Sequence, residues 1–134
     1  MTLLFDASAV INLIMKGSRR ALPSTRNGCV LDLTEYEIGN AAWQLCAVEK
    51  KLTGQEAAGL LRTASAFLEQ LRRVRLDELD PDSILAIAIA EGSTFYDASY
   101  VEAATFSRMT LVTDDAELRE VARKRVPVQR STDV

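Results

Sequence analysis

Four carboxylates stand beside apolar segments of the chain, far enough apart to come from separate elements: Asp6, Glu37, Asp97 and Asp115. The chain contains no histidine, and its two cysteines stand far apart without forming a CxxC pair. These absences remove the commonest general base, the commonest zinc ligand and every Ser-His or Cys-His nucleophile pair. Carboxylate oxygens suit a hard divalent cation such as Mg²⁺ or Mn²⁺. The sequence therefore favours metal-assisted chemistry on a phosphate group.

Each of these acids, taken alone, also has a structural explanation, because aspartate and glutamate are favoured at helix N-caps and first turns. Glu37 fits a capping box with Thr34, and Asp114 could cap a helix in which Asp115 is a first-turn residue. Capping does not explain why carboxylates follow two apolar strands and also open two further helices. Acids crowded together repel one another unless a cation joins them. We therefore interpret the four acids as one set.

The apolar pattern predicts the elements that carry these acids. Short apolar runs predict buried strands over residues 2–6, 29–33, 74–76, 110–113 and 126–129. Helical spacing and capping residues predict helices over residues 8–15, 34–52, 53–71, 80–92, 94–108 and 114–125. This alternation predicts an α/β fold, a doubly wound and mostly parallel sheet of about five strands with helices on both faces. Ligands of such sheets bind beyond the carboxyl ends of the strands, where Asp6 and Asp115 would fall.

The composition limits the class of protein. The chain has 134 residues, of which 48% are hydrophobic, so we expect a single domain over residues 1–134. No apolar run approaches the roughly 20 residues that span a bilayer, and the N-terminus lacks the basic start of a signal peptide. We therefore expect a cytoplasmic protein with reduced cysteines and no membrane partner. The net charge of −3 is unusual for a nucleic-acid partner, but a metal-binding acid cluster lowers the formal charge without repelling phosphate.

Four strings of residues resemble, in order and spacing, the motifs of PIN-domain proteins: Phe5-Asp6-Ala7-Ser8, Glu37-Ile38-Gly39-Asn40-Ala41-Ala42, Tyr96-Asp97-Ala98-Ser99-Tyr100 and Leu111-Val112-Thr113-Asp114-Asp115. The similarity covers nearly the whole chain and is greatest to the VapC-type toxins of prokaryotic toxin–antitoxin pairs. It implies a PIN-like doubly wound sheet and an endoribonuclease that uses one or two Mg²⁺ or Mn²⁺ ions per site. It also implies a homodimer and inhibition by a small VapB-type antitoxin.

The resemblance assigns Asp6, Glu37, Asp97 and Asp115 to the catalytic metal site, with Asp114 as the alternative fourth acid. Nearby polar residues could orient the carboxylates or metal-bound waters, although a cap or turn role explains them equally well: Asn12, Asn40, Thr113 and Asp114. The basic residues after the first helix would grip RNA phosphates near the groove: Lys16, Arg19, Arg20 and Arg26.

Other phosphoryl-transfer proteins fit the sequence less well. A receiver domain needs neighbouring acids after its first strand and a lysine after its last, whereas Ala7 and Ser8 follow Asp6 and no lysine follows Val126. A haloacid-dehalogenase phosphatase needs an aspartate at position 8, which is serine. The remaining alternative to a nuclease is a catalytically inactive PIN-like interaction or RNA-binding module, in which the acids serve as caps or hold a metal structurally.

Overall fold

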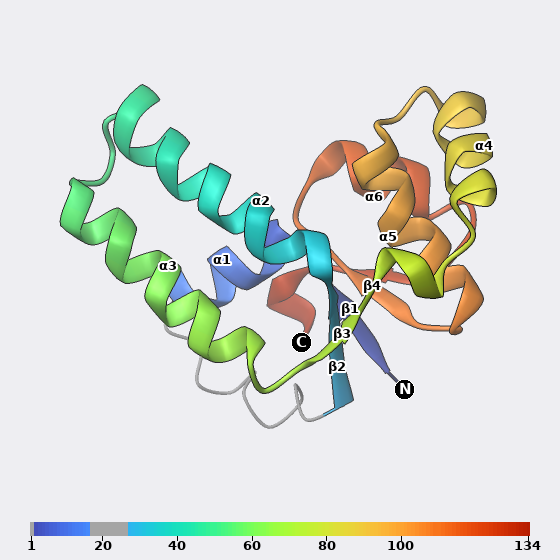
Figure 1. Ribbon diagram of the computed structural model, residues 1–134, viewed down its shortest axis with the longest axis horizontal. Coiled ribbons are helices and arrows are strands. Elements are labelled where there is room, and N and C mark those ends of the chain that lie inside the picture. Colours follow the sequence, from blue (N-terminus) through green and yellow to red (C-terminus); the bar gives the residue numbers. More distant parts are fainter. Residues whose placement is uncertain (1, 17–26) are drawn as a thin grey trace.

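Five parallel strands form the sheet on which the molecule is built. The computed structural model describes residues 2–16 and 27–134 (Figure 1). The strand order is β3-β2-β1-β4-β5, and every neighbouring pair is parallel. The strands are β1 (Leu3–Phe5), β2 (Gly28–Leu31), β3 (Arg72–Val74), β4 (Thr110–Val112) and β5 (Val128–Gln129). The predicted α/β class is confirmed.

In residues 2–16 and 27–134, six α-helices connect the strands, as the sequence pattern predicted. They are α1 (Ala7–Met15), α2 (Asp32–Trp43), α3 (Gly54–Leu68), α4 (Pro81–Glu91), α5 (Phe95–Phe106) and α6 (Ala116–Ala122). A π-helical segment, η3 (Gln44–Val48), continues α2, and two short 3₁₀ turns, η4 (Leu76–Glu78) and η5 (Ser131–Asp133), follow β3 and β5. In Figure 1, α1, α2 and α3 lie on one side of the sheet and α4, α5 and α6 on the other.

Three strand predictions were wrong at their boundaries, and one of them is the last strand, which begins at Val128 rather than at Val126. The third strand was expected at residues 74–76 but covers Arg72–Val74. It lies at the edge of the sheet and exposes Arg72 and Arg73, so its sequence does not show the apolar run of a buried strand. The second strand ends at Leu31 rather than at Leu33, because α2 already begins at Asp32. That early start changes the position of Glu37 within the helix.

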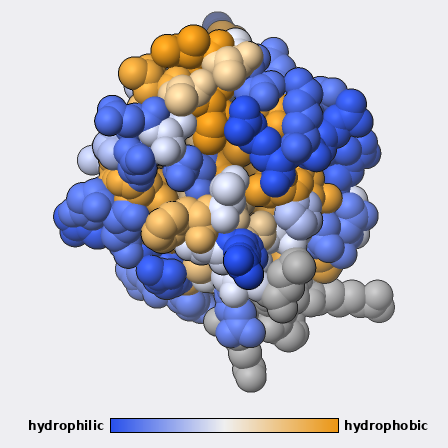
Figure 2. Space-filling view, turned by 90° about the vertical axis from the view of Figure 1, so that its right-hand side faces the viewer, coloured by the Kyte–Doolittle hydropathy of each residue, from blue (hydrophilic) through white to orange (hydrophobic). Residues whose placement is uncertain are grey.

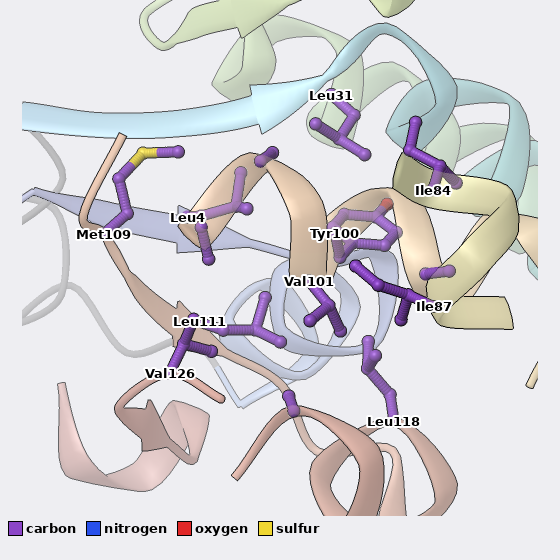
Figure 3. Packing of buried hydrophobic residues seen from close by; sticks show 14 of the residues in the cluster. Leu4, Leu31, Ile84, Ile87, Tyr100, Val101, Met109, Leu111, Leu118 and Val126 are labelled. Atoms are coloured by element: carbon purple, nitrogen blue, oxygen red, sulfur yellow. The ribbon is translucent and has the colours of Figure 1, made fainter. Parts of the chain in front are cut away.

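The sheet separates two hydrophobic cores, because neighbouring residues of a strand point to opposite faces. Leu4 and Leu111 pack with α4, α5 and α6 in one core, where Tyr100 lies among aliphatic side chains (Figure 3). Phe5 and Val112 pack in the other core with α1, α2 and α3. Burial on both faces fixes the strand register, since a slip of one residue would reverse every side chain. The register in turn fixes where the strands end and the acids begin.

The outer surface formed by α4, α5 and α6 combines polar and apolar areas. Figure 2 shows the side on which α4, α5 and α6 lie, with hydrophilic flanks and a hydrophobic area near the top. Helix α4 exposes Leu85 and Ile89, although its other face is buried in the core. Within the described residues, no helix combines the length and the hydropathy needed to cross a membrane. Cys29 and Cys46 are free thiols.

Candidate active site

An open groove of about 970 Å³ lies at the carboxyl edge of the sheet, and all four predicted acids line it. Asp6 follows β1 directly and caps α1, and Asp115 follows β4 and caps α6. Glu37 comes from α2, and Asp97 comes from the first turn of α5. The tertiary structure therefore brings to one groove four carboxylates that are spread over 110 positions of the sequence.

Asp6 is buried, with only 5% of its surface exposed, and three neighbours hold its carboxylate in place. Its Oδ1 accepts hydrogen bonds from the Ala9 amide at 2.9 Å and the Ser8 hydroxyl at 2.8 Å. Its Oδ2 accepts a hydrogen bond from the Thr113 hydroxyl at 2.6 Å. Burial raises the pKa of Asp6 to about 6, and the negative charge of Asp115 adds to the rise, although the three hydrogen bonds oppose it.

Thr113 connects the end of β4 to the end of β1. Its Oγ1 donates to Asp6 and accepts from the Asp115 amide at 3.1 Å. A second connection runs through Ser8, whose Oγ accepts from the Asp114 amide at 3.0 Å. Because Thr113 and Ser8 are held on both sides, the two loops that carry Asp6 and Asp115 have a fixed relative position.

Glu37 does not cap a helix, in contrast to the capping box predicted with Thr34. Because α2 begins at Asp32, Glu37 lies in its second turn and reaches the groove, while Thr34 Oγ1 accepts from the Leu31 amide at 3.0 Å. Thr34 Oγ1 lies 2.8 Å from the Tyr100 hydroxyl, which donates to Glu37 Oε1 at 2.6 Å. Since the only hydroxyl hydrogen of Tyr100 goes to Glu37, Thr34 donates to Tyr100. This chain of hydrogen bonds orients the Glu37 carboxylate.

The acids also act on one another electrostatically. Burial raises the pKa of Glu37, the hydrogen bond from Tyr100 opposes this rise, and the charges of Asp6, Asp97 and Asp115 add to it. Burial likewise raises the pKa of Asp97 to about 6, with contributions from the charges of Asp115 and then Glu117. Like charges thus destabilise one another's ionised forms across the groove. A bound cation would relieve that repulsion.

Asp114 and Asp115 have different surroundings, although they are neighbours in sequence. Burial alone would raise the pKa of Asp114, but hydrogen bonds from Ser131 and Asn12, together with the charge of Lys16, lower it overall. Asn12 Nδ2 donates to Asp114 Oδ2 at 2.7 Å, and the Ser131 amide donates to Oδ1 at 3.0 Å. Asp114 therefore ties α1 to the C-terminal turn.

Asp115 is itself the N-cap of α6, whereas the sequence suggested that Asp114 could be the cap and Asp115 a first-turn residue. Its Oδ1 accepts from the Glu117 amide at 2.9 Å and the Leu118 amide at 3.4 Å. The side chain is exposed, and its charge raises the pKa values of Asp6, Glu37 and Asp97. Of the two neighbours, Asp115 is the acid that interacts electrostatically with the other three.

The remaining residues predicted for the site are the supporting asparagines and the basic RNA-binding residues. Asn40 and Asn12 line the groove, and Asn12 bonds to Asp114. Lys16 is exposed at the C-cap of α1. The remaining predicted RNA-binding residues, Arg19, Arg20 and Arg26, lie outside the described residues.

Sequence reasoning missed Ser8, Thr34 and Tyr100 as supporting side chains, and Glu117 as a further acid near Asp97. A local signal existed for two of them. Ser8 stands two residues after Asp6 in an N-cap segment, and Tyr100 stands three residues after Asp97, one helical turn away. The partner of Tyr100 is Glu37, 63 positions away, and that pairing is visible only in the tertiary structure.

Fold and site together define an α/β protein with an acidic groove at the carboxyl edge of a doubly wound parallel sheet. The profile of the PIN domain matches residues 3–124. The chain therefore belongs to the PIN-domain family, and the family resemblance stated from its sequence motifs is confirmed.

Two curated relatives from Pyrobaculum aerophilum carry VapC names. The chain is 35% identical to Exonuclease VapC9 over 100 residues, which cover 75% of this chain and 71% of that protein. It is 33% identical to Ribonuclease VapC3 over 125 residues, which cover 90% of this chain and 94% of that protein. This similarity extends over most of the domain.

Two solved structures have the same fold. PAE2754 from Pyrobaculum aerophilum matches with a TM-score of 0.79 and 30% identity, covering 99% of this chain and 94% of the other. DNA-bound VapBC from Salmonella typhimurium matches with a TM-score of 0.68 over 98% of both chains, and at 16% identity this likeness concerns the fold alone.

Proposed function

We propose that this chain is a divalent-metal-dependent ribonuclease that hydrolyses RNA phosphodiester bonds, and that it is the toxin of a VapBC-type pair. The observation that carries the proposal is the convergence of four carboxylates from four segments on one groove. Burial raises the pKa values of Asp6, Glu37 and Asp97 there, and the charge of Asp115 adds to each rise. The VapC names of two relatives, one called an exonuclease and the other a ribonuclease, support nuclease chemistry.

The donor set of the groove fits Mg²⁺ or Mn²⁺. Its acids offer carboxylate oxygens, which these ions prefer, and Asp6, Glu37, Asp97 and Asp115 would hold one or two of them. Within residues 2–16 and 27–134, no three acidic or cysteine side chains already converge as a ready set of ligands. Mg²⁺ usually keeps several waters and takes only one or two carboxylates directly, so a looser arrangement suits it.

The chain's own side chains prepare this site. Ser8 and Thr113 fix the orientation of Asp6, and Tyr100 fixes that of Glu37. Burial raises the pKa of the Tyr100 hydroxyl well above its ordinary value, so it stays a hydrogen-bond donor at neutral pH. When bound, the metal would supply a water of lowered pKa and stabilise charge on the leaving oxygen. No nucleophilic side chain is then needed.

The test is incubation of purified protein with linear and circular RNA in the presence of Mg²⁺, Mn²⁺ or EDTA. Circular RNA has no ends, so its cleavage identifies endonuclease activity, which we expect, while cleavage of linear RNA alone identifies an exonuclease. Asp6→Asn and Asp97→Asn should lose activity. The matched control is Asp82→Asn, which removes an exposed carboxylate on α4 outside the groove.

Two outcomes would contradict this function. Cleavage that persists in EDTA, or in both groove variants, would overturn the proposed carboxylate-metal site. A folded wild-type protein that neither cleaves RNA nor binds a divalent ion would favour the inactive interaction module instead. The fourth acid is tested by comparing Asp115→Asn, which should abolish activity, with Asp114→Asn, which should reduce it only through loss of the contact with Asn12.

The toxin role predicts that expression of the chain alone arrests growth and that a co-expressed VapB-type antitoxin relieves the arrest. Harmless expression of protein with full nuclease activity would contradict that role. RNA binding is assigned in part to Lys16, Arg19, Arg20 and Arg26, so their joint replacement by serine should weaken RNA binding at low salt more than at high salt.

We further propose that the chain forms a homodimer through the apolar outer surface of α4, where Leu85 and Ile89 are exposed. Light scattering should give the mass of a dimer for the wild type and of a monomer for Leu85→Glu/Ile89→Glu. The control Ala66→Glu places a single glutamate on an exposed position of α3 and should leave the dimer intact, and the single variants Leu85→Glu and Ile89→Glu allow comparison at equal charge. A monomeric wild type would refute the dimer.

A further inference from the structure

A second and smaller pocket of about 250 Å³ opens beside the acidic groove. Aliphatic and aromatic side chains form most of its wall: Leu33, Leu76, Leu79, Phe95, Tyr36 and Tyr96. Its volume lies below the roughly 300–1,000 Å³ of pockets that enclose drug-sized ligands. A single flat ring system is therefore a better match for it than an extended molecule.

This pocket adjoins the acidic groove, because Leu33, Tyr36 and Tyr96 line both. Tyr36 directly precedes Glu37 on α2, and Tyr96 directly precedes Asp97 on α5. Neighbouring residues of a helix point about 100° apart, so each tyrosine faces the side next to its acid. An occupant of the pocket would lie directly beside a phosphate in the groove.

The two tyrosines are unusually open to solvent. Tyr36 is 82% exposed and Tyr96 is 59% exposed, so their rings do not serve the core. Exposed aromatic rings beside a phosphate site are what proteins use to stack the bases of single-stranded nucleic acid. We propose that this pocket, with Tyr36 and Tyr96 at its rim, binds a base of the RNA strand next to the phosphate in the acidic groove. This inference rests on the proposed function in one respect, which is that RNA is the ligand.

The polar side chains in the wall indicate how the base is recognised. Asp32 Oδ1 accepts from the Leu33 amide at 2.9 Å, and its Oδ2 accepts from the Leu76 amide at 3.2 Å. Ser99 Oγ donates to the Phe95 carbonyl at 2.8 Å. Because each of these groups already has a partner within the protein and the rest of the wall is apolar or aromatic, the pocket favours contact with the face of a base over its edge. Adenine and uracil should both bind, without hydrogen-bond selection between them.

The test compares three eight-nucleotide probes: oligoadenylate, oligouridylate and an abasic ribose-phosphate chain of the same length. Binding is measured by fluorescence anisotropy in Ca²⁺, a cation that carboxylate oxygens bind and that offsets the charge of the groove, and a gel run afterwards verifies that the probes remain intact. The wild type should bind both base-bearing probes more tightly than the abasic chain. Tyr36→Ala and Tyr96→Ala should each weaken binding of the base-bearing probes roughly 5- to 150-fold, the range for loss of one stacked base. Binding of the abasic chain should not change.

Two kinds of control separate stacking from other effects. Tyr36→Phe and Tyr96→Phe keep the ring and should bind like the wild type. Phe106→Ala removes a ring that is 71% exposed on α5 but lines neither the groove nor the pocket, and it should also bind normally. An equal loss for the abasic chain, or no loss in the alanine variants, would overturn the base-binding pocket. Alanine variants that bind RNA normally but lose a co-purifying protein partner would also overturn the base-binding pocket, because the pocket would then be a protein-docking site.

Failure of this inference is distinguishable from failure of the nuclease function. A wild type that cleaves RNA while the tyrosine variants bind it normally overturns the pocket alone. A wild type that binds base-bearing RNA through both tyrosines without cleaving it upholds the pocket and overturns the nuclease.

Discussion

Replacement of Asp6 by asparagine should stabilise the metal-free protein at neutral pH while it abolishes cleavage. The pKa of Asp6 rises from an ordinary 3.8 to about 6 in the folded state. At 1.36 kcal/mol per pH unit, that rise corresponds to a cost of about 3 kcal/mol for keeping the buried carboxylate ionised. Asparagine can still accept the hydrogen bond from the Ala9 amide, because it is a favourable N-cap residue.

The pH dependence of this effect gives its clearest measurement. Because the folded state binds the Asp6 proton more tightly than the unfolded state, protonation stabilises the fold, and this contribution is lost as pH rises from about 3.8 through about 6. Between pH 4.5 and pH 7.5 the wild type should lose about 2 kcal/mol more stability than Asp6→Asn. Urea unfolding at both pH values, in EDTA, measures this difference.

The exposed acid Asp82 supplies the control. Asp82→Asn should show no comparable change in its stability relative to the wild type between the two pH values. Addition of Mn²⁺ at pH 7.5 should then stabilise the wild type but not Asp6→Asn, because only the former keeps the acid set that binds the ion. A constant stability difference between Asp6→Asn and wild type across this pH range would refute the reasoning that Asp6 is held ionised against its burial.

Three further substitutions test the positioning side chains and the backbone. Thr113→Val removes the hydrogen bond to Asp6 and should lower the free energy of unfolding in urea by about 1.5–3 kcal/mol at pH 7.5. The loss should be smaller at pH 4.5, and an equal loss at both pH values would contradict a bond to the ionised acid. Tyr100→Phe should lower the free energy of unfolding by about 1–3 kcal/mol and weaken Mn²⁺ binding in calorimetry, since Glu37 loses its hydrogen-bond donor. An unchanged Mn²⁺ affinity would show that this hydrogen bond does not prepare the site. Arg108 has a left-handed φ of 54° at the end of α5, so Arg108→Gly should stabilise the protein by about 0.5–1 kcal/mol in thermal unfolding, and a loss would contradict backbone strain there.

Local signals were sufficient where a residue's structural role depends on its chain neighbours. The capping box of Thr53 and Glu56 forms at the start of α3, and Asp80, Pro81 and Gly92 delimit α4 as predicted. These interactions span at most one helical turn, so the sequence pattern alone determines them.

Local signals failed where tertiary contacts compete with them. Thr34 and Glu37 have the spacing of a capping box, yet Thr34 bonds to Tyr100 and Leu31, and Glu37 bonds to Tyr100. The buried hydroxyl of Tyr100 needs a partner within the protein, and α2 is close enough to provide it. The capping-box spacing of Thr34 and Glu37 therefore marks two residues that bond to Tyr100 and not a capping box between them.

The sequence by itself determined the alternation of strands and helices and the four acids beside them, because periodicity and residue type are properties of the chain. Only the tertiary structure decided that these acids share one groove, that Asp115 rather than Asp114 interacts electrostatically with the other three, and that Tyr36 and Tyr96 open a second pocket beside them. The physical reason is that burial, charge repulsion and hydrogen bonds across the groove depend on distances in space. The order of the residues along the chain does not specify those distances.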